Sequence, residues 1–289
     1  MELIELAKSK INLSLNLSGK KANGFHNLIS FICFGNFSDK LILKKSKKFS
    51  YKVNTSLSDT HLKDDLVIRV INKIKKEYYL KELPKIDLIL QKNIPIGAGL
   101  GGGSADAAAT IRLMNKFLDL GMSQDEMCDF GKDLGADIPA CIVSKPIIAY
   151  GRGEKLRKVD FRKSYHMLII YPKIEIHTKE IFSLIGPMQT KDLDTKKAKK
   201  TIELLSGGLK NNILETFDND LQDYAFKAYP SLVDIINILN INNSFFSRMT
   251  GSGSACFGLF ESEFIDKAFD SIKKEHPEWL IEKTLLNDL

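Results

Sequence analysis

Cysteine is scarce in this chain of 289 residues, and its four cysteines lie far apart with no CxxC pair. This spacing argues against a zinc site and against a disulfide scaffold, and it favours a reducing compartment. Long apolar runs are missing as well. The first residues do not read as a signal peptide, and no segment approaches the length of a membrane span. We therefore expect a cytoplasmic localisation and no membrane partner.

A strong excess of one charge is also absent. The net charge is +6, with 27% charged and 44% apolar residues, which is typical of a globular protein with room for one large domain or two modest ones. Eight of the 42 basic residues are lysines gathered in residues 44–48 and 196–200. Such clusters can bind nucleic acid, but neither is interleaved with aromatic residues or joined to a nucleic-acid-binding motif. We expect solvated faces there and no nucleic-acid partner.

Glycine, in contrast, is concentrated in one place, the run Pro-Ile-Gly-Ala-Gly-Leu-Gly-Gly-Gly-Ser-Ala at residues 95–105. A strand is expected before it at 86–90, and an alanine-rich helix is expected after it at 105–118 with Ser104 as its cap. Glycines let backbone N–H groups approach a bound group closely, and a helix N-terminus adds partial positive charge. The run therefore predicts an anion cradle of the kind that binds nucleotide phosphates.

Three other kinds of loop share parts of this glycine pattern. It satisfies the Gly-x-Gly-x-x-Gly fingerprint of dinucleotide-binding folds, but Ser123 and Glu126 then start another helix where a second parallel strand is required. No Gly-Lys-Ser or Gly-Lys-Thr closes the run, so it is not a P-loop. A glycine-rich turn without a ligand is the remaining alternative.

Periodicity predicts a β-rich first half and an α+β second half. The first half is expected to have strands at 11–17, 29–37, 40–43, 86–90 and 146–150, helices at 64–79, 105–118 and 123–134, and turns at Asn23-Gly24 and Ser38-Asp39. From about Lys155 we expect strands at 166–171, 245–249, 255–260 and 279–283 and helices at 178–184, 195–205, 217–227, 231–239 and 263–274. This order is compatible with a ferredoxin-like sandwich.

The glycine run resembles the phosphate loop of the GHMP kinases, the family of galactose, homoserine, mevalonate and phosphomevalonate kinases. The resemblance implies a two-lobed α+β fold with its active site between an N-terminal ATP-binding lobe at 1–154 and a C-terminal substrate-side lobe at 155–289. It also implies ATP and Mg²⁺ as cofactors. Glycines replace the family's usual serines at 102 and 103, so no magnesium ligands are predicted. The residues expected to bind ATP are Pro95, Ile96, Gly97, Ala98, Gly99, Leu100, Gly101, Gly102, Gly103, Ser104 and Ala105.

Two further segments match the family's catalytic motifs. The element Gly-Ala-Asp-Ile-Pro contains Asp137, which the resemblance implies is the catalytic carboxylate that orients the acceptor hydroxyl and accepts its proton. From the sequence alone an acid at such a junction is equally a helix cap or turn former. Lys10, before Asn12 near the N-terminus, resembles the catalytic lysine. Apart from the resemblance, a lone lysine at a strand start is usually solvated.

The acceptor is implied by a smaller set of residues. Phe25 and His26 match an aromatic–histidine pair that holds cytosine in the branch of the family that phosphorylates a cytidine-diphosphate-linked methylerythritol. Phe25 stands where that branch usually has tyrosine. Thr178 and Phe182 resemble the segment whose aromatic residue closes the other face of the base, and Asn12 is expected to bind substrate. The simpler reading of Phe25 and Phe182 is as core residues.

Two more positions bear on the nucleotide. Residues 249–256 resemble the family's third motif, a glycine turn that faces the phosphate loop, although a plain β-hairpin would show the same pattern. Asp65 stands where the branch often has an asparagine near the nucleotide, so the contacts to adenine stay open.

The function expected from the resemblance is ATP-dependent phosphorylation of the 2-hydroxyl of that sugar alcohol, by a protein that is a monomer or a weak homodimer. One alternative keeps the fold and changes the acceptor to homoserine, mevalonate or a sugar, which carry no base for Phe25 to stack on. The other is a non-catalytic ligand sensor or RNA-binding relative, which would have no use for both Lys10 and Asp137.

Overall fold

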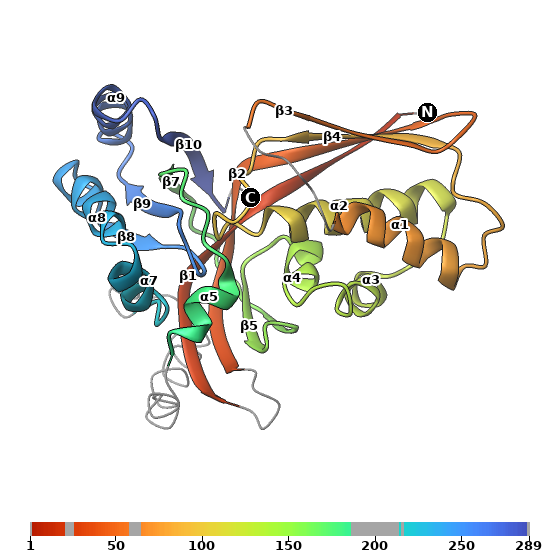
Figure 1. Ribbon diagram of the computed structural model, residues 1–289, viewed down its shortest axis with the longest axis horizontal. Helices are drawn as coiled ribbons and strands as arrows, with labels where there is room; N and C mark the ends of the chain where they lie inside the picture. Colours follow the sequence, from red (N-terminus) through yellow and green to blue (C-terminus); the bar gives the residue numbers. More distant parts are fainter. Residues whose placement is uncertain (1, 21–25, 58–64, 186–213, 215–216, 288–289) are drawn as a thin grey trace. The chain divides into compact units, whose positions relative to one another are not determined.

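The computed structural model describes residues 2–20, 26–57, 65–185, 214 and 217–287. Its elements are labelled in Figure 1. The chain divides into two compact units, and the division does not follow chain order. Unit 1 comprises Met1–Lys10, Ser38–Ile96 and Gly101–Ser144, and unit 2 comprises Ile11–Phe37, Gly97–Leu100 and Lys145–Leu289. The strands β1 (Glu2–Lys20) and β2 (His26–Lys45) each contribute to both units. The functional division at residue 154 stays a prediction.

Unit 1 places helices on one side of a small mixed sheet (Figure 1). The end of β2 pairs antiparallel with β4 (Ile86–Lys92), and β3 (Ser50–Thr55) pairs parallel with β4. Alternate residues of β4 are buried, as expected for a strand with one face toward a core. The helices of the unit are α1 (Leu66–Glu77), α2 (Gly102–Leu118), α3 (Gln124–Gly131) and α4 (Ile138–Val143).

Unit 2 contains a sheet in the order β10-β7-β9-β8 with every neighbouring pair antiparallel. Helix α8 lies in the chain between β7 and β8, and α9 lies between β9 and β10, which is the ferredoxin-like arrangement that the sequence predicts. Beyond β1 and β2, the described part of the unit contains β5 (Ile147–Gly151), β6 (Lys155–Lys158), β7 (Tyr165–Tyr171), α5 (Thr178–Ser183), α7 (Gln222–Ala228), α8 (Ser231–Ile241), β8 (Phe246–Met249), β9 (Cys256–Phe260), α9 (Ile265–Glu275) and β10 (Leu280–Leu286).

Three local predictions are wrong. Strand β2 continues through Ser38-Asp39, because Asp39 is fully buried and paired with Lys92 rather than exposed in a turn. Ser104 does not cap α2, which begins earlier, at Gly102, with Gly101 as its N-cap. The helix expected at 217–227 begins only at Gln222, because Asn219 accepts the backbone N–H of Leu221 in a separate turn.

Other elements went unpredicted. The strands β3 and β6 and the six-residue helix α4 are too short for periodicity to reveal. The predicted capping box of α3 is confirmed, with Ser123 and Glu126 exchanging hydrogen bonds. The helix expected at 195–205 and the Asn23-Gly24 turn fall outside the residues that the structure describes.

Lys44 and Lys45 end β2, and Lys47 and Lys48 follow in the connection to β3, with all four exposed. The second lysine cluster, at 196–200, lies outside the described residues. No helix in the described part of the chain is both long and apolar enough to cross a membrane.

Candidate active site

A lysine and a carboxylate from distant parts of the sequence form an ion pair within unit 1. The Nζ of Lys10, on β1, lies 2.9 Å from Oδ2 of Asp137, and their side chains are 7% and 41% exposed. Asp137 occupies the N-cap position of α4, but its side chain makes no capping hydrogen bond there. The carboxylate is therefore not used as a helix cap, and it is partly open to solvent beside a buried cation.

The second half of the glycine run touches this pair. Gly101 has φ +68°, and a β-carbon on it would lie 3.0 Å from Cβ and 3.1 Å from Cε of Lys10. Glycine suits this position, because a side chain would be strained in the left-handed backbone and would press on the lysine. Helix α2 begins here with no side-chain cap among the described residues. Its first backbone N–H groups are therefore suited to an external anion.

The first half of the run, Gly97–Leu100, belongs to unit 2 and is held by backbone contacts. The N–H of Ile176 donates to the carbonyl of Gly97 at 3.3 Å, and the N–H of Ala255 donates to the carbonyl of Ala98 at 2.9 Å. A β-carbon on Gly99 would lie 2.5 Å from the carbonyl oxygen of Thr250. The turn between β8 and β9 is thus both a hairpin and a direct neighbour of the glycine run.

Two of the predicted acceptor-binding residues, Asn12 and Thr178, make hydrogen bonds to serines of unit 2. Asn12 is buried, and its Nδ2 donates to Oγ of Ser30 at 2.7 Å, while its Oδ1 is buried with no hydrogen-bond partner in the described structure. Oγ1 of Thr178 lies 2.9 Å from Oγ of Ser252. Phe182 is half-buried against the core of the unit. Phe25 lies outside the described residues, and His26 is the first residue of β2.

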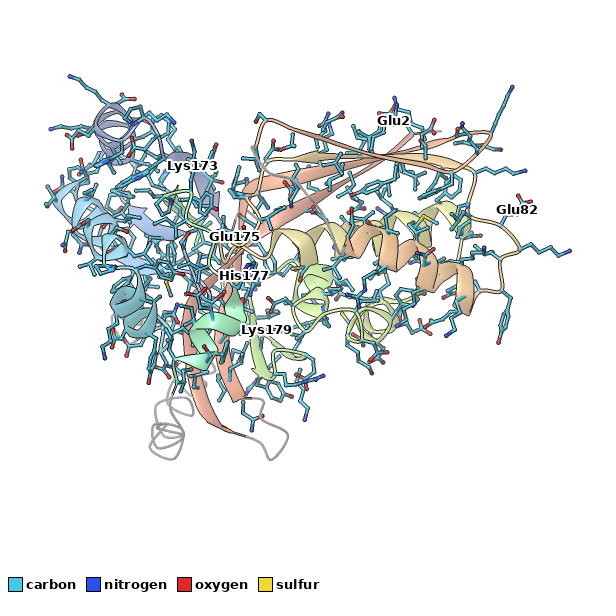
Figure 2. The ribbon with its side chains drawn as sticks, viewed as in Figure 1. Glu2, Glu82, Lys173, Glu175, His177 and Lys179 are labelled. Atoms are coloured by element: carbon cyan, nitrogen blue, oxygen red, sulfur yellow. The ribbon has the colours of Figure 1, made fainter. Side chains whose placement is uncertain are left out.

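An exposed charged segment leads into α5. Figure 2 labels Lys173, Glu175, His177 and Lys179 along it, and all four are exposed. Nδ1 of His177 lies 3.9 Å from Oε1 of Glu175, and a β-carbon on Gly97 would collide with the Glu175 side chain. The start of the glycine run is therefore close to an acidic side chain. Asp65, in unit 1, caps α1 by accepting the N–H of Val67 at 2.8 Å.

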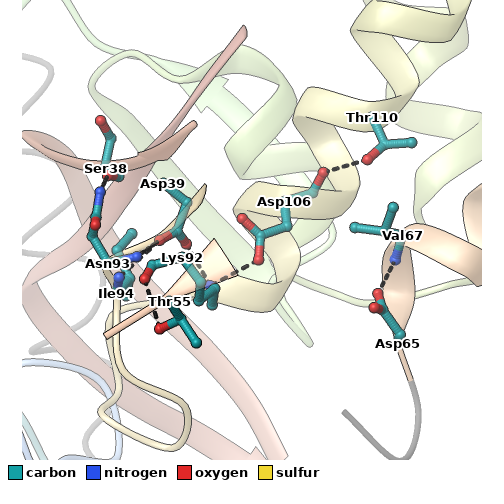
Figure 3. Close-up of polar contacts among 10 residues, drawn as sticks. All are labelled: Ser38, Asp39, Thr55, Asp65, Val67, Lys92, Asn93, Ile94, Asp106 and Thr110. Carbon is teal, nitrogen blue, oxygen red and sulfur yellow. Dashed lines mark hydrogen bonds and ion pairs between the residues drawn. The ribbon is translucent and has the colours of Figure 1, made fainter. Parts of the chain in front are cut away.

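Sequence reasoning missed a buried ion cluster beside α2 (Figure 3). Nζ of Lys92 lies 2.7 Å from Oδ2 of Asp106 and also pairs with Oδ2 of Asp39. A signal for it existed, since Lys92 continues the buried alternation of β4 at a position where a core residue is expected. A lysine on the inward face of a strand requires carboxylate partners.

Comparison with known proteins decides the family. The model described as "GHMP kinases N terminal domain" matches residues 65–145, and the one described as "GHMP kinases C terminal" matches residues 200–278. The chain belongs to the GHMP kinase family. This member is therefore a small-molecule kinase with ATP as its phosphate donor, as the sequence predicts.

Curated relatives of this GHMP kinase match it over nearly its whole length. The 4-diphosphocytidyl-2-C-methyl-D-erythritol kinase of Mesorhizobium japonicum is 31% identical over 281 residues, covering 96% of this chain and 94% of that protein. The protein of the same name from Caldanaerobacter subterraneus subsp. tengcongensis is 31% identical over 286 residues, covering 99% of this chain and 98% of that protein.

Solved structures agree on the fold. A crystal structure of 4-(cytidine 5'-diphospho)-2C-methyl-D-erythritol kinase superposes with a TM-score of 0.81 at 22% identity, covering 99% of this chain and 100% of that one. The mevalonate kinase of Methanococcus jannaschii follows with a TM-score of 0.72 at 18% identity, covering 98% of each chain. At these identities the superpositions bear on the GHMP kinase fold alone.

Proposed function

We propose that this GHMP kinase transfers the γ-phosphoryl group of ATP to the 2-hydroxyl of 4-diphosphocytidyl-2-C-methyl-D-erythritol, a step of non-mevalonate isoprenoid precursor synthesis. The ion pair between Lys10 and Asp137, at 2.9 Å, is the observation that carries the chemistry. The choice of acceptor is supported by the full-length similarity to relatives that bear this enzyme's name.

In this proposal Asp137 accepts a hydrogen bond from the acceptor hydroxyl, orients it toward the γ-phosphorus and takes its proton as the new O–P bond forms. Lys10 is buried beside it, so its charge holds the carboxylate in place and offsets negative charge on the transferring group. Phosphoryl transfer depends mainly on positioning and charge stabilisation, so a small set of residues is sufficient.

The residues from Pro95 to Ala105 would cradle the phosphates of ATP. Mg²⁺ is expected with the nucleotide, where it would neutralise negative charge on the phosphates. Among the described residues, no group of three His, Cys, Asp or Glu side chains is arranged to hold a metal. Mg²⁺ is commonly held by one or two protein oxygens together with substrate phosphates and water.

The acceptor would be recognised by two kinds of contact. Phe25 and Phe182 offer flat faces for the cytosine, and His26 offers a hydrogen bond to its edge. Asn12 already uses an amide N–H on Ser30, so its unpartnered Oδ1 would accept a hydrogen bond from the substrate, and Thr178 would add a hydroxyl. The lobe roles assigned to 1–154 and 155–289, the cytoplasmic localisation and a monomeric or weakly dimeric state belong to the same proposal.

The experiment is ADP release by the purified full chain with Mg·ATP and one acceptor at a time: the cytidine compound, homoserine, mevalonate or galactose. A reaction without acceptor gives the background. We expect turnover with the cytidine compound alone. Activity on a different acceptor would retain the kinase and overturn the substrate, and silence with all four would contradict the proposed reaction.

A further inference from the structure

The ion cluster of Lys92, Asp39 and Asp106 has no part in the proposed chemistry, yet it is among the most buried polar groups of unit 1. The three residues are 2%, 0% and 4% exposed. They come from three elements, β4, β2 and α2, and Figure 3 shows both carboxylates directed at one ammonium group. One lysine cannot neutralise two ionised carboxylates, so the cluster carries a net negative charge unless a proton is bound.

Asp39 has more hydrogen-bond donors around it than Asp106 has. Its Oδ2 pairs with Lys92, and its Oδ1 accepts the backbone N–H groups of Asn93 at 2.5 Å and Ile94 at 2.8 Å. This set of donors suits an anionic carboxylate.

Asp106 has a poorer environment for a negative charge. Its Oδ2 pairs with Lys92 at 2.7 Å, but its Oδ1 is buried and has no hydrogen-bond partner in the described structure. Burial raises the pKa of Asp106 to about 8, with the charge of Asp39 adding to the effect and Lys92 opposing it. Burial also disfavours the charge of Lys92, but the two carboxylates outweigh that effect and raise its pKa. A proton that the cluster gains near neutral pH therefore resides on Asp106.

The cluster lies against the backbone of the glycine run. Asp106 stands in the first turns of α2, directly after that run. A β-carbon on Gly102 would lie 2.9 Å from Nζ of Lys92, so the ammonium group is in contact with the loop. A charge on this cluster acts at short range on any anion that the loop holds, through a medium from which water is largely excluded.

Tyr51 and Cys141 also interact with the charge of Asp106, and both side chains stay neutral over the same pH range. Burial and the carboxylates of Asp65 and Asp106 raise the pKa of Tyr51, on β3, far above its ordinary value. Burial and Asp137 raise the pKa of Cys141, on α4, to about 12. Asp65, at the start of α1, is engaged by the N–H of Val67.

We propose that Asp106 links proton binding to nucleotide binding: the glycine run binds the phosphates of Mg·ATP more tightly when Asp106 is protonated, and a proton is taken up from solvent onto its carboxylate as the nucleotide binds. This inference rests on the proposed role of the run in binding ATP. By thermodynamic reciprocity, whatever favours the protonated carboxyl also favours the bound nucleotide. Asp106 acts through the electrostatic field at the loop and touches no reacting atom.

The expected consequence is that the affinity for Mg·ATP falls as pH rises from about 7 to 9.5. The affinity for Mg·ATP is expected to fall about three- to tenfold, which is typical of one partly screened charge at short distance. In Asp106→Asn the side chain keeps its shape and an acceptor for Lys92 but cannot ionise. Its affinity for Mg·ATP is expected to be the same at both ends of the pH range.

The test is calorimetric titration of the full chain with Mg·ATP and no acceptor, at several pH values and in two buffers of different ionisation enthalpy. The dependence on buffer gives the protons taken up. The matched control is Asp119→Asn, which removes the same charge from an exposed site at the other end of α2 and should leave the wild-type pH profile in place. Infrared difference spectra of the wild type, in which nucleotide binding should raise the band of a protonated carboxyl group, need no folded variant.

Proton uptake near pH 8 in the wild type and the control, with none in Asp106→Asn, would support the linkage. Binding with no proton uptake, or with the same uptake in Asp106→Asn, would overturn it while leaving the kinase proposal intact. Failure to bind Mg·ATP at any pH would overturn both, and an acceptor other than the cytidine compound would affect only the substrate assignment.

Discussion

Asp137 shows how a neighbour decides what a side chain does. It occupies an N-cap position, where an aspartate commonly binds the backbone of its own helix, yet its carboxylate pairs with Lys10 instead. The sequence alone could not separate these two roles, because both use the same residue at the same local position. The choice depends on a strand that is remote in the sequence.

Replacing Asp137 with Asn is expected to lower kcat by about 10²- to 10⁴-fold with little change in acceptor binding, because the amide keeps the size of the side chain and loses the proton acceptor. Steady-state ADP release and acceptor titration would measure the two effects separately. Asp129→Asn is the matched control, since Asp129 is 73% exposed in a surface ion pair with Lys132. Near-normal turnover in Asp137→Asn would remove Asp137 from the mechanism.

At the scale of elements, the join between the glycine run and α2 combines local and tertiary requirements. Composition alone predicts a turn followed by a helix, and both are present. The helix begins earlier than Ser104, because Gly101 adopts the left-handed conformation that ends the loop. A second reason for glycine at this position is the nearby side chain of Lys10, which no local pattern could reveal.

The prediction at this scale compares two glycines that share a backbone conformation. Gly101 and Gly121 both have φ +68°, but Gly121 has no atom within 4 Å of where a β-carbon would lie. Gly101→Ala and Gly121→Ala should each lose about 1–2 kcal/mol of unfolding free energy from left-handed strain.

Only Gly101→Ala should also lower kcat, by about tenfold or more, because it displaces Lys10 from Asp137. Urea unfolding and ADP release would measure stability and turnover. Equal kcat values in the two variants would show that the contact between Gly101 and Lys10 does not matter for turnover.

For the molecule as a whole, folding stability should depend on pH through Asp106. Its pKa is raised by burial from an ordinary value of 3.8 to about 8. Between these values the native state holds a proton that the unfolded chain has released. The free energy of unfolding should therefore fall as pH rises through this window and level off above about pH 8.

In Asp106→Asn the free energy of unfolding should fall less steeply as pH rises, by up to about 1.4 kcal/mol per pH unit. Urea unfolding at about pH 5, 7 and 9 would measure the difference, with Asp119→Asn as the control for loss of a surface charge. Parallel pH profiles for the wild type and Asp106→Asn would show that Asp106 does not hold a proton in the native state.

Much of the fold could be predicted because it rests on local chemistry. Apolar periodicity, the Ser123–Glu126 capping box and the order of strands and helices from Tyr165 onward are properties of short segments. The structure confirms them, apart from the helix expected at 195–205, which lies outside the described residues. The glycine run could also be recognised from the sequence, because so many closely spaced glycines are costly to order unless the backbone must approach another group closely. Local sequence is sufficient to specify these features, because each depends on residues that are close together in the chain.

The pairing of charged side chains follows from the tertiary structure and not from local sequence. Lys10 finds Asp137, and Lys92 lies between Asp39 and Asp106, because the strands and helices of unit 1 bring distant segments together. The sequence around a charged residue looks the same whether the residue is solvated, paired or buried. The free-energy cost of burying its charge, and its role, depend on surroundings that other parts of the chain supply. The carboxylate environments, and the proton linkage proposed for one of them, therefore follow from the folded state.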